Sequence, residues 1–527
     1  MKDLQWEFPY SSQRMPVFAA NTVAASQPLA AQAGLRMLLM GGNAVDAALA
    51  AAITLTVVEP VSNGLGSDAF ALIWDGKKLW GINGSGPSPA AWSREYFAKY
   101  AEMPVTGWDA VTVPGAVDVW GRLSERFGSL GFSKLFAPAI AYARHGFTVS
   151  PRIAEAWADA PEKYGRMPSF ARTFLPGGKS PRAGQLFSCP PMANSLEKIA
   201  DSHGESFYRG RLAEKIADCS AAEGGAMTMA DLAAYRSEWV EPVSVAYRDV
   251  RLHEIPPNGQ GLAALMALGI LAHFPMKDFA PDAADSIHLQ VEAMKIAFAA
   301  AHAHIADPAF TDRDFHDFLT ADFLAEKAGQ IRKDKAAVPV QPPKDRGTVY
   351  LAAADEKGMM VSYIQSNFTG FGSGVVVPGT GISMQSRGYG FRLEKGHPNC
   401  VAGGKRPYHT IIPGFVTKGD GALMSFGVMG GHMQPQGHVQ MMVRIFDCGQ
   451  NPQAASDAPR WHICEDGTLA LEKGISPEVA EELRKRGHEI SDIDPYWGYG
   501  GAQLIYRLAN GYCAASDHRK DGQAVGF

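Results

Sequence analysis

The chain has 527 residues, of which 46% are hydrophobic and 20% are charged, so it can form a packed core and is not intrinsically disordered. Its length allows roughly two to four domains of about 150 residues each, or one large α/β body. The formal net charge is −5, and no basic stretch predicts nucleic-acid binding. The longest apolar run, residues 47–58, is too short to span a bilayer. No secretory signal is visible at the start, so we expect a cytoplasmic, enzyme-like protein.

The cysteines are scattered along the chain. None forms a CxxC pair, and their long separations fit neither a zinc site nor a disulfide scaffold. We therefore expect structural thiols in a reducing compartment. The positions are Cys189, Cys219, Cys400, Cys448, Cys464 and Cys513.

The first hundred residues predict a strand, two helices and a hairpin. Residues 17–20 are strand-like, and residues 28–40 form a helical pattern with proline in the first turn and glycines just past the end. Asn43 is placed to cap a second, Ala-rich helix. After a glycine-rich turn, residues 69–82 contain two short apolar strands joined by an Asp-Gly turn, which predicts a hairpin.

The middle of the chain is mostly helical and then changes in composition. Residues 285–303 carry apolar side chains at helical spacing, and a turn over residues 256–261 leads into another helix. Residues 326–346 are charged, contain several prolines and have few large apolar side chains, which predicts a solvated connector. Directly after it, Gly347 and Thr348 precede a strand, a glycine turn and a second strand.

Thr348 can act as a nucleophile if it becomes the first residue of a chain. A threonine hydroxyl is weakly nucleophilic without a neighbouring base, and a free α-amine, which titrates at about pH 8, is a base within the same residue. Such a terminus requires the precursor to cut itself between Gly347 and Thr348, where glycine leaves room for the hydroxyl to attack. By spacing alone, the alternative is a plain β-forming threonine.

Two adjacent glycines are a second candidate for chemistry. Gly430 and Gly431 follow an apolar strand over residues 422–429. They can present consecutive backbone N–H groups in a concave turn, as an oxyanion hole requires. The alternative is a structural turn between a strand and a helix.

Two further polar groups have simpler explanations. The run over residues 405–413 is by default a surface loop that leads into a strand. His302, His304 and Asp307 invite a metal site, but residues two apart on a helix point to different faces. Histidines satisfied at a helix end are therefore the favoured interpretation.

Together these features resemble the gamma-glutamyltranspeptidase family of N-terminal-nucleophile hydrolases, and the likeness covers almost the whole chain. The pattern is most similar to a divergent branch that includes cephalosporin (glutaryl) acylases. The segments that carry the likeness, in the family's order, are residues 41–48, 57–60, 64–66, 112–116, 256–261, 292–298, 347–348, 405–407 and 430–431.

The resemblance implies an α+β fold, specifically a four-layer αββα sandwich. A large segment, 1–347, ending in an exposed linker over 326–347, and a small segment, 348–527, would build it jointly and stay associated after cleavage. The implied partners are a small amide or peptide substrate and the other fragment of the same precursor. No cofactor, metal, nucleic acid or membrane is implied, and a homo-oligomer is left open.

The resemblance also assigns catalytic roles. Thr348 would be the nucleophile for cleavage after Gly347 and for acylation by substrate, with its freed amine as the base. Gly430 and Gly431 would donate N–H groups to the tetrahedral oxyanion. Water or an amine would then resolve the acyl-enzyme, which gives hydrolysis or transfer.

Residues that bind the charged ends of a γ-glutamyl group in the family are replaced here. The arginine that pairs with the α-carboxylate falls near Ser85, and the Gln and Asp that hold the α-amine fall on Arg387 and Gly390. A zwitterion without its counter-charges would leave desolvated, unpaired ions. Arg387 therefore favours an acyl group that ends in a carboxylate and lacks an α-amine, such as glutaryl, unless it pairs with a protein carboxylate.

Other substrate-binding positions also differ. The two serines that follow Lys-Arg-Pro in the family become His409 and Thr410, and the family's asparagine becomes Ser366, with Asn367 beside it. We expect an autoprocessing amidase that cleaves or transfers γ-glutamyl or related acyl groups, from glutathione-type or glutaryl-amide substrates. The alternatives are a cephalosporin (glutaryl) acylase, a non-catalytic binding protein that keeps the fold, and a metal hydrolase built on residues 302–307.

Overall fold

The computed structural model describes residues 14–340, 347–493 and 498–527. Within these ranges, two antiparallel sheets of seven strands each form the centre of the molecule. Sheet A contains, in spatial order, β1 (Val17–Ala19), β20 (Gly511–Ser516), β19 (Gly501–Leu508), β15 (Gly421–Met429), β14 (Gly414–Lys418), β9 (Val250–Glu254) and β8 (Val243–Tyr247). Sheet B contains β21 (Gln523–Gly526), β2 (Thr22–Ala25), β10 (Val349–Ala354), β11 (Met360–Ser366), β3 (Asp68–Trp74), β4 (Leu79–Gly84) and β7 (Glu238–Val240).

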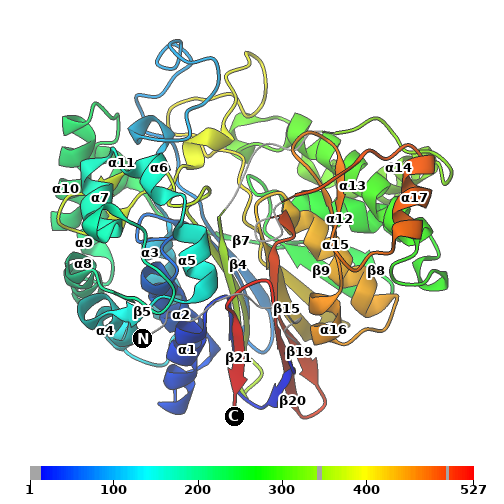
Figure 1. The fold of residues 1–527 in the computed structure, drawn as a ribbon, viewed down its shortest axis with the longest axis horizontal. Coiled ribbons are helices and arrows are strands. Elements are labelled where there is room, and N and C mark those ends of the chain that lie inside the picture. The colour runs from blue at the N-terminus through cyan, green and yellow to red at the C-terminus, as the bar shows by residue number, and fades with distance from the viewer. Residues whose placement is uncertain (1–13, 341–346, 494–497) are drawn as a thin grey trace, which may run out of the picture.

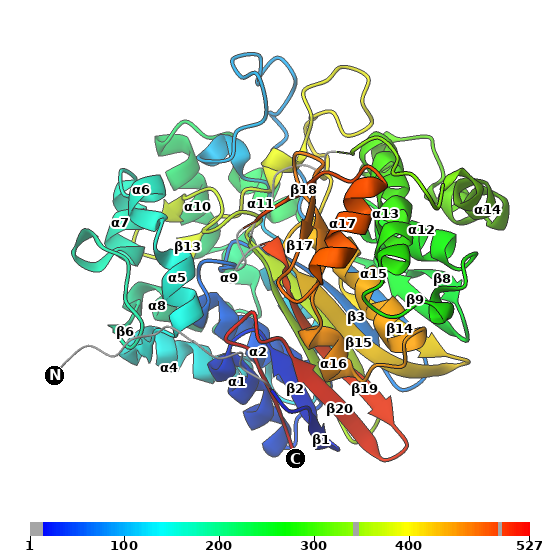
Figure 2. The same cartoon turned by 45° about the vertical axis from the view of Figure 1, so that its right-hand side comes forward.

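Two groups of helices lie on opposite sides of the sheets (Figure 1). The group beside sheet B comprises α1 (Pro28–Leu39), α2 (Ala44–Val58), α3 (Ala116–Phe127), α4 (Ala137–His145), α5 (Pro151–Trp157), α6 (Ala160–Tyr164), α7 (Pro168–Phe174), α8 (Pro190–Asp201), α9 (Glu205–Tyr208), α10 (Arg211–Ala222) and α11 (Met229–Ala234). The group beside sheet A comprises α12 (Gly261–Leu271), α13 (Ala284–His304), α14 (Ala321–Gln330), α15 (Met433–Phe446), α16 (Pro452–Asp457) and α17 (Pro477–Lys485). Figure 2 shows the long strands inclined between these two groups.

Small sheets complete the secondary structure around this centre. They pair β5 (Phe147–Thr148) with β6 (Leu186–Phe187), β12 (Val376–Val377) with β13 (Ile382–Ser383), and β17 (Leu469–Leu471) with both β16 (Trp461–Ile463) and β18 (Ile490–Ser491).

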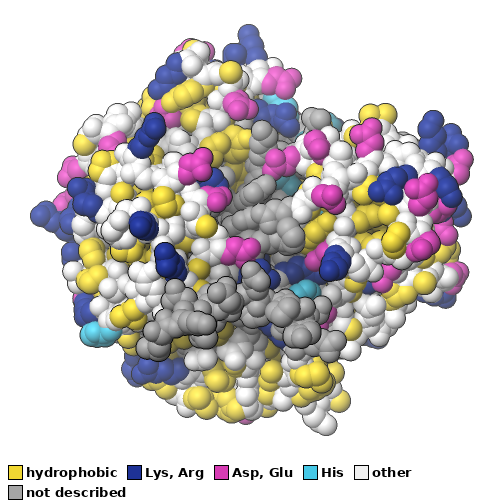
Figure 3. Space-filling view, in the orientation of Figure 1, with side chains coloured by type: hydrophobic (Ala, Val, Ile, Leu, Met, Phe, Trp, Pro, Cys, Tyr) yellow, Lys and Arg dark blue, Asp and Glu magenta, His cyan; other side chains and the backbone are white. Residues whose placement is uncertain are grey.

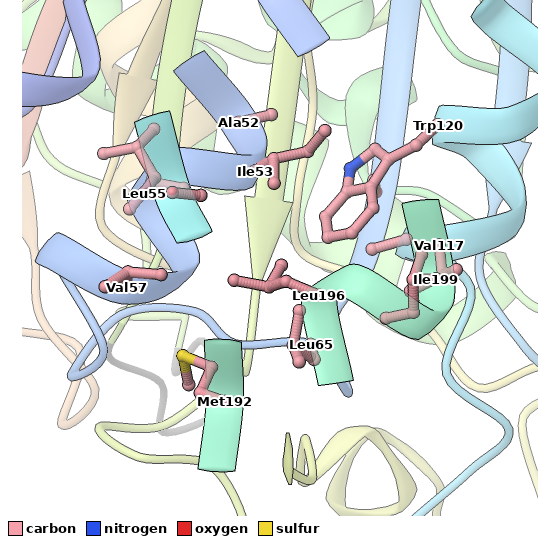
Figure 4. Packing of buried hydrophobic residues seen from close by; sticks show 14 of the residues in the cluster. Ala52, Ile53, Leu55, Val57, Leu65, Val117, Trp120, Met192, Leu196 and Ile199 are labelled. Atoms are coloured by element: carbon pink, nitrogen blue, oxygen red, sulfur yellow. The ribbon is translucent and has the colours of Figure 1, made fainter. Parts of the chain in front are cut away.

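Helix α2 is the central element of the helical group beside sheet B. All of its residues are buried, as expected for a helix that is apolar on every side. Its many alanines let neighbouring helices approach closely, while its larger side chains fill the space between them. Figure 4 shows Ile53 of α2 next to Trp120 of α3, with Leu196 of α8 in the same cluster.

Strand β10 shows why the sequence of a central strand is a continuous apolar run. Val349 and Leu351 pack in the core shared with the α1–α11 group. Tyr350, between them, faces the opposite way into a core that also contains Phe415 of β14 and Ile505 of β19. Because successive side chains of a strand point to opposite faces, a strand buried on both faces needs apolar residues at every position. Sheet B therefore packs against helices on one face and sheet A on the other.

The elements predicted for the first hundred residues are confirmed. β1 and α1 lie where the pattern places them, and β3 and β4 form the predicted hairpin. Asn43 caps α2, because its side chain accepts hydrogen bonds from the amides of Val45 and Asp46, both at 3.0 Å. The predicted helix over residues 285–303 corresponds to α13, and the strands that flank Gly358 correspond to β10 and β11.

The connector differs in part from its prediction. Helix α14 continues to Gln330, inside the expected linker, and Ala328 is buried against the helices beside sheet A. Ala337 is also tied down, since its amide donates to Glu292 Oε2 at 2.8 Å and its carbonyl accepts from Lys295 Nζ at 3.2 Å. The connector is therefore partly docked on α13. Residues 341–346 lie outside the described residues.

The distribution of charge on the surface and the state of the cysteines agree with the expectations from composition. On the face drawn in Figure 3, basic and acidic side chains are interspersed. None of the described helices is long and apolar enough to cross a membrane. All six cysteines are free thiols, as expected.

Candidate active site

The hydroxyl of Thr348 lies against the peptide bond that precedes it. Gly347 has a φ of 112°, a conformation that glycine adopts without a Cβ penalty, and Thr348 directly precedes β10 in the middle of sheet B. Thr348 Oγ1 donates to the carbonyl oxygen of Gly347 at 2.7 Å, and the threonine is only 4% exposed. The hydroxyl is therefore held at the carbonyl that it would attack in self-cleavage.

Ser366 lies at the same peptide. Its Oγ donates to the Gly347 carbonyl oxygen at 2.7 Å and lies 3.1 Å from Thr348 Oγ1. The amide of Phe368 donates to Ser366 Oγ at 2.9 Å, which fixes the hydroxyl. The neighbouring Asn367 instead accepts from Ser67 through Oδ1. Of these two candidate residues, Ser366 is the one that contacts the Thr348 hydroxyl.

The glycine pair forms a tight turn at the end of β15. Gly430 and Gly431 have φ values of 114° and 56°, and α15 begins two residues later. The side chain of Gln260 ties this turn to a neighbouring segment, because Nε2 donates to the carbonyl oxygens of Gly431 at 3.0 Å and Thr410 at 2.5 Å. The backbone carbonyl of Gly431 thus points to Gln260.

His409 and Thr410 point to different surroundings. His409 is fully buried, and its Nε2 lies 3.0 Å from Asp68 Oδ2. Thr410 Oγ1 accepts a hydrogen bond from Arg387 at 2.7 Å. The Arg387 guanidinium, also fully buried, lies 4.6 Å from the centre of the Phe368 ring. Arg387 and Thr410 therefore lie together, whereas the hydrogen-bond partner of His409 is Asp68.

Burial controls the electrostatics of that pair. It raises the pKa of Asp68 to about 7, although the positive charge of Arg387 opposes the shift. Burial, reinforced by Arg387, also lowers the pKa of His409 well below its usual value. His409 is therefore neutral at pH 7, and its Nε2–H donates to Asp68 while Nδ1 accepts from the amide of Ile411.

Ser85 is also buried, and its hydroxyl contacts Asn258, whose carbonyl oxygen accepts from the amide of His409 at 3.0 Å. Its Oγ lies 3.0 Å from Nδ2 and 3.2 Å from Oδ1 of Asn258. Asn258 Nδ2 in turn donates to the carbonyl oxygen of Pro407 at 2.7 Å. Ser85 therefore bonds the loop after β4 to the loop before α12.

A pocket opens beside Phe368 and Thr410, with a cavity volume of about 470 Å³. That volume lies within the usual range for small-molecule sites. Buried side chains form its floor, namely Phe368, Tyr408, Thr410 and His432. Exposed charged residues stand at its rim, namely Glu102, Arg392, Glu394 and Glu465. The remaining lining residues are Ala101, Met103, Tyr389, Gly390, Phe391 and Leu393.

The three residues considered for a metal do not converge. The ring of His302 stacks on Phe298 at 5.5 Å, and His304 stacks on Phe318 at 5.3 Å. Asp307 Oδ2 accepts from a backbone amide of the 405–413 run at 2.9 Å. Each side chain thus has a structural partner of its own.

Among the described residues, one other group has the ligand types and spacing for a metal: His288, Glu292 and His488. Its atoms are already paired with each other or with neighbours. His288 Nδ1 lies 2.8 Å from His488 Nε2, and Glu292 Oε1 accepts from Lys295 Nζ at 2.9 Å. The ammonium group beside Glu292 also disfavours a second cation. This cluster is therefore a hydrogen-bonded tie between α13 and the end of α17.

Comparison with known proteins identifies the family. The family profile described as Gamma-glutamyltranspeptidase matches residues 30–527. The chain belongs to the gamma-glutamyltranspeptidase family.

Relatives in the gamma-glutamyltranspeptidase family match nearly the whole chain. The chain is 35% identical over 515 residues to the glutathione hydrolase-like YwrD proenzyme of Bacillus subtilis strain 168, which covers 95% of this chain and 97% of the relative. It is 37% identical over 517 residues to the oxamate amidohydrolase proenzyme of Klebsiella pneumoniae, with the same two coverages. The crystal structure of cephalosporin acylase from Bacillus halodurans matches with a TM-score of 0.95 and 45% identity, over 100% of this chain and 99% of that one.

The sequence alone did not identify three residues that lie at the candidate site of this gamma-glutamyltranspeptidase family member. Gln260 lies within the turn over residues 256–261, Asp68 follows the 64–66 segment by two residues, and His432 directly follows the glycine pair, but none was singled out. An acidic side chain just after a glycine-rich loop, and a histidine directly after the glycine pair, are the signals that could have found two of them. Gln260 gave no comparable signal, since its two carbonyl partners come from distant segments.

Proposed function

We propose that this protein is a self-cleaving amidohydrolase that uses Thr348 as an N-terminal nucleophile. One observation carries the proposal: Thr348 Oγ1 lies 2.7 Å from the carbonyl oxygen of Gly347, with Ser366 Oγ hydrogen-bonded to the same oxygen. A hydroxyl and a donor directed at one carbonyl are the parts that acyl transfer needs. The proenzyme names of two relatives support the same conclusion.

Self-cleavage would proceed as an acyl shift. Thr348 Oγ attacks the carbonyl carbon of Gly347, the C–N bond to Thr348 breaks, and an ester forms between the two residues. Water then hydrolyses the ester, which leaves a carboxylate on Gly347 and a free α-amine and hydroxyl on Thr348. No co-reactant besides water is required.

The freed terminus would repeat this chemistry on a substrate amide. The α-amine takes the hydroxyl proton as Thr348 Oγ attacks the substrate carbonyl, and the N–H groups of the Gly430–Gly431 turn stabilise the oxyanion. The proton passes to the leaving amine, and an acyl ester remains on Thr348. Water releases the acid, or an amine accepts the acyl group.

The proposed substrate is an amide of a γ-glutamyl or related acyl group, with glutaryl favoured. Gly390 at the pocket has no carboxylate to hold an α-amine, whereas Arg387 lies behind Thr410 in the pocket floor. The cephalosporin acylase match supports an acylase more than a glutathione hydrolase. We also propose that the two sheets and their helices form the four-layer sandwich of N-terminal-nucleophile hydrolases, shared between segments 1–347 and 348–527.

Intact mass under denaturing conditions tests the nucleophile. We expect the wild type to give two fragments of roughly two thirds and one third of the chain, the smaller beginning at Thr348. Thr348→Ala should stay uncut, and Thr348→Ser should still cleave. An uncut wild type would contradict the proposal and favour a binding protein.

A panel of p-nitroanilides tests the substrate class on the cleaved protein. Glutaryl, γ-glutamyl and acetyl derivatives share one leaving group, so differences in kcat/KM report the acyl group alone. We expect the order glutaryl, then γ-glutamyl, then acetyl. Faster turnover of the γ-glutamyl derivative would overturn the preference without affecting the assignment of the nucleophile.

A further inference from the structure

His432 is buried at the pocket, yet its imidazole makes no hydrogen bond to the described protein residues. It directly follows the glycine pair at the start of α15 and lines the pocket floor with only 4% of its surface exposed. Neither Nδ1 nor Nε2 has a hydrogen-bond partner. Buried polar groups in proteins are nearly always paired, so an unpaired imidazole facing a pocket points to a missing ligand.

Aromatic neighbours hold the imidazole in place. Its ring stacks on Tyr408, with centroids 6.0 Å apart and planes at 22°, and stands nearly perpendicular to His302 at 5.8 Å and Phe298 at 6.2 Å. These contacts come from α13 and from the segment that carries Thr410. The ring orientation is thus fixed by packing, while the hydrogen-bonding capacity of both buried nitrogens is not used by the described protein residues.

The charged groups near His432 indicate which charge a ligand group would carry. Burial, together with His302, His462 and Arg387, holds the pKa of His432 well below its usual value, so the imidazole is neutral at pH 7. Of the groups that act on it, Arg387 carries a positive charge, whereas His302 is itself neutral at pH 7, because burial lowers its pKa to about 4. The carboxylates of the pocket stand at the exposed rim, not on the floor. The floor therefore favours an anionic group, and the neutral imidazole can donate to it.

We propose that His432 donates a hydrogen bond to the terminal carboxylate of the substrate's acyl chain and so sets the acyl preference of the enzyme. This inference rests on the proposed function. The carboxylate lies on the pocket floor between His432 and Thr410, with the Arg387 charge behind it. The scissile carbonyl then lies toward the glycine pair, which directly precedes His432 in the chain.

Three amides with one leaving group test this assignment. The glutaryl, glutaramyl and butyryl p-nitroanilides end in a carboxylate, a neutral amide of similar shape and a methyl group. His432→Phe keeps the ring stacking and removes the donor, and His432→Gln restores a donor. His304→Phe is the control, because His304 neither lines the pocket nor contacts the His432 ring and instead stacks on Phe318.

We expect His432→Phe to lower the ratio of kcat/KM for glutaryl over butyryl by about 10-fold or more, mainly through KM, as for loss of a hydrogen bond to a charged group. His432→Gln should regain part of the ratio, and His304→Phe should keep it. An unchanged ratio in His432→Phe, or an equal loss in His304→Phe, would overturn the proposal.

Binding of glutarate to the cleaved wild type and to His432→Gln gives a second measurement, by calorimetry, with glutaramate as the neutral probe. Glutarate should bind the wild type more tightly than glutaramate does, and His432→Gln should narrow that difference. Equal affinities for the two probes would refute the carboxylate assignment. Failure of the proposed function would instead appear as an uncut wild-type chain, so the two outcomes are distinguishable.

Discussion

Ser366→Ala should slow self-cleavage strongly while leaving the fold intact. The serine hydroxyl donates to the Gly347 carbonyl oxygen at 2.7 Å, where negative charge would develop as Thr348 attacks. In the variant this donor is absent, although the Thr348 hydroxyl keeps its position at the start of β10. Cleavage should therefore continue by the same route, only more slowly.

The size of the effect follows from the position of the donor. Loss of one preorganised donor at a developing oxyanion typically lowers a rate by on the order of 10² to 10³, which corresponds to about 3 to 4 kcal/mol of barrier. The substitution also leaves the buried amide of Phe368 without its acceptor. That unpaired amide should lower the free energy of unfolding by about 1 to 3 kcal/mol. The kinetic effect should thus be accompanied by a measurable but tolerable loss of stability.

A cell-free synthesis reaction, sampled over time and analysed by denaturing intact mass, measures the cleavage rate directly. Ser362→Ala is the matched control, because Ser362 lies on the same face of β11 and its hydroxyl contacts Tyr350 at 2.7 Å, away from the cleavage point. The control should cleave at the wild-type rate. Wild-type cleavage in Ser366→Ala, or equal slowing in both variants, would refute the role assigned to Ser366.

Further expectations concern the oxyanion turn and two buried charges. Gly430→Ala places a side chain at a φ of 114°, so p-nitroanilide turnover by the cleaved protein should fall by about 10²-fold or more, and unchanged turnover would count against the oxyanion role. Burial raises the pKa of Glu59 to about 7, so its protonated form stabilises the fold at low pH and this stability is lost as the pH rises through 7. Between pH 4.5 and 8, the free energy of unfolding of Glu59→Gln should fall by about 3 kcal/mol less than that of the wild type, as measured by thermal unfolding. Parallel pH profiles for the two proteins would contradict this role of Glu59. Against burial, Arg460 and Arg519 hold the pKa of Asp517 well below its usual range. Asp517→Asn should therefore lower stability at neutral pH by about 3 to 5 kcal/mol in denaturant titrations, with no comparable loss for the exposed control Asp466→Asn.

Local patterns sufficed to predict much of the fold. The end of α1 before two glycines, the Asn43 cap and the hairpin of β3 and β4 all depend on residues within a few positions of each other. The same holds for the strand after Thr348 and for the turn after β15. In each case the signal is a backbone preference or a side-chain bond that the neighbouring sequence already contains.

The candidate site required information that local patterns do not contain. His409 and Thr410 are adjacent in the chain, yet one pairs with Asp68, 341 residues away, and the other with Arg387. Thr410 lines the pocket and His409 does not. This difference depends on how sheet B packs against the loop before β14. The family resemblance placed both at one site, and only the packed structure shows that their side chains have different hydrogen-bond partners.

The topology around Thr348 bears on what cleavage would do to the molecule. In sheet B, β10 pairs with β2 on one side and with β11 on the other, and β11 pairs with β3. Strands from before and after the proposed cleavage point are thus interleaved in this sheet, because β10 and β11 lie between β2 and β3. A cut before β10 would free the nucleophile without removing any of these ladders, while neither fragment alone could cover both faces of the sheet. We therefore expect the two fragments to elute together in native size-exclusion chromatography and to separate only in denaturant. Separation of folded fragments without denaturant would mean that the shared sheet does not hold them together.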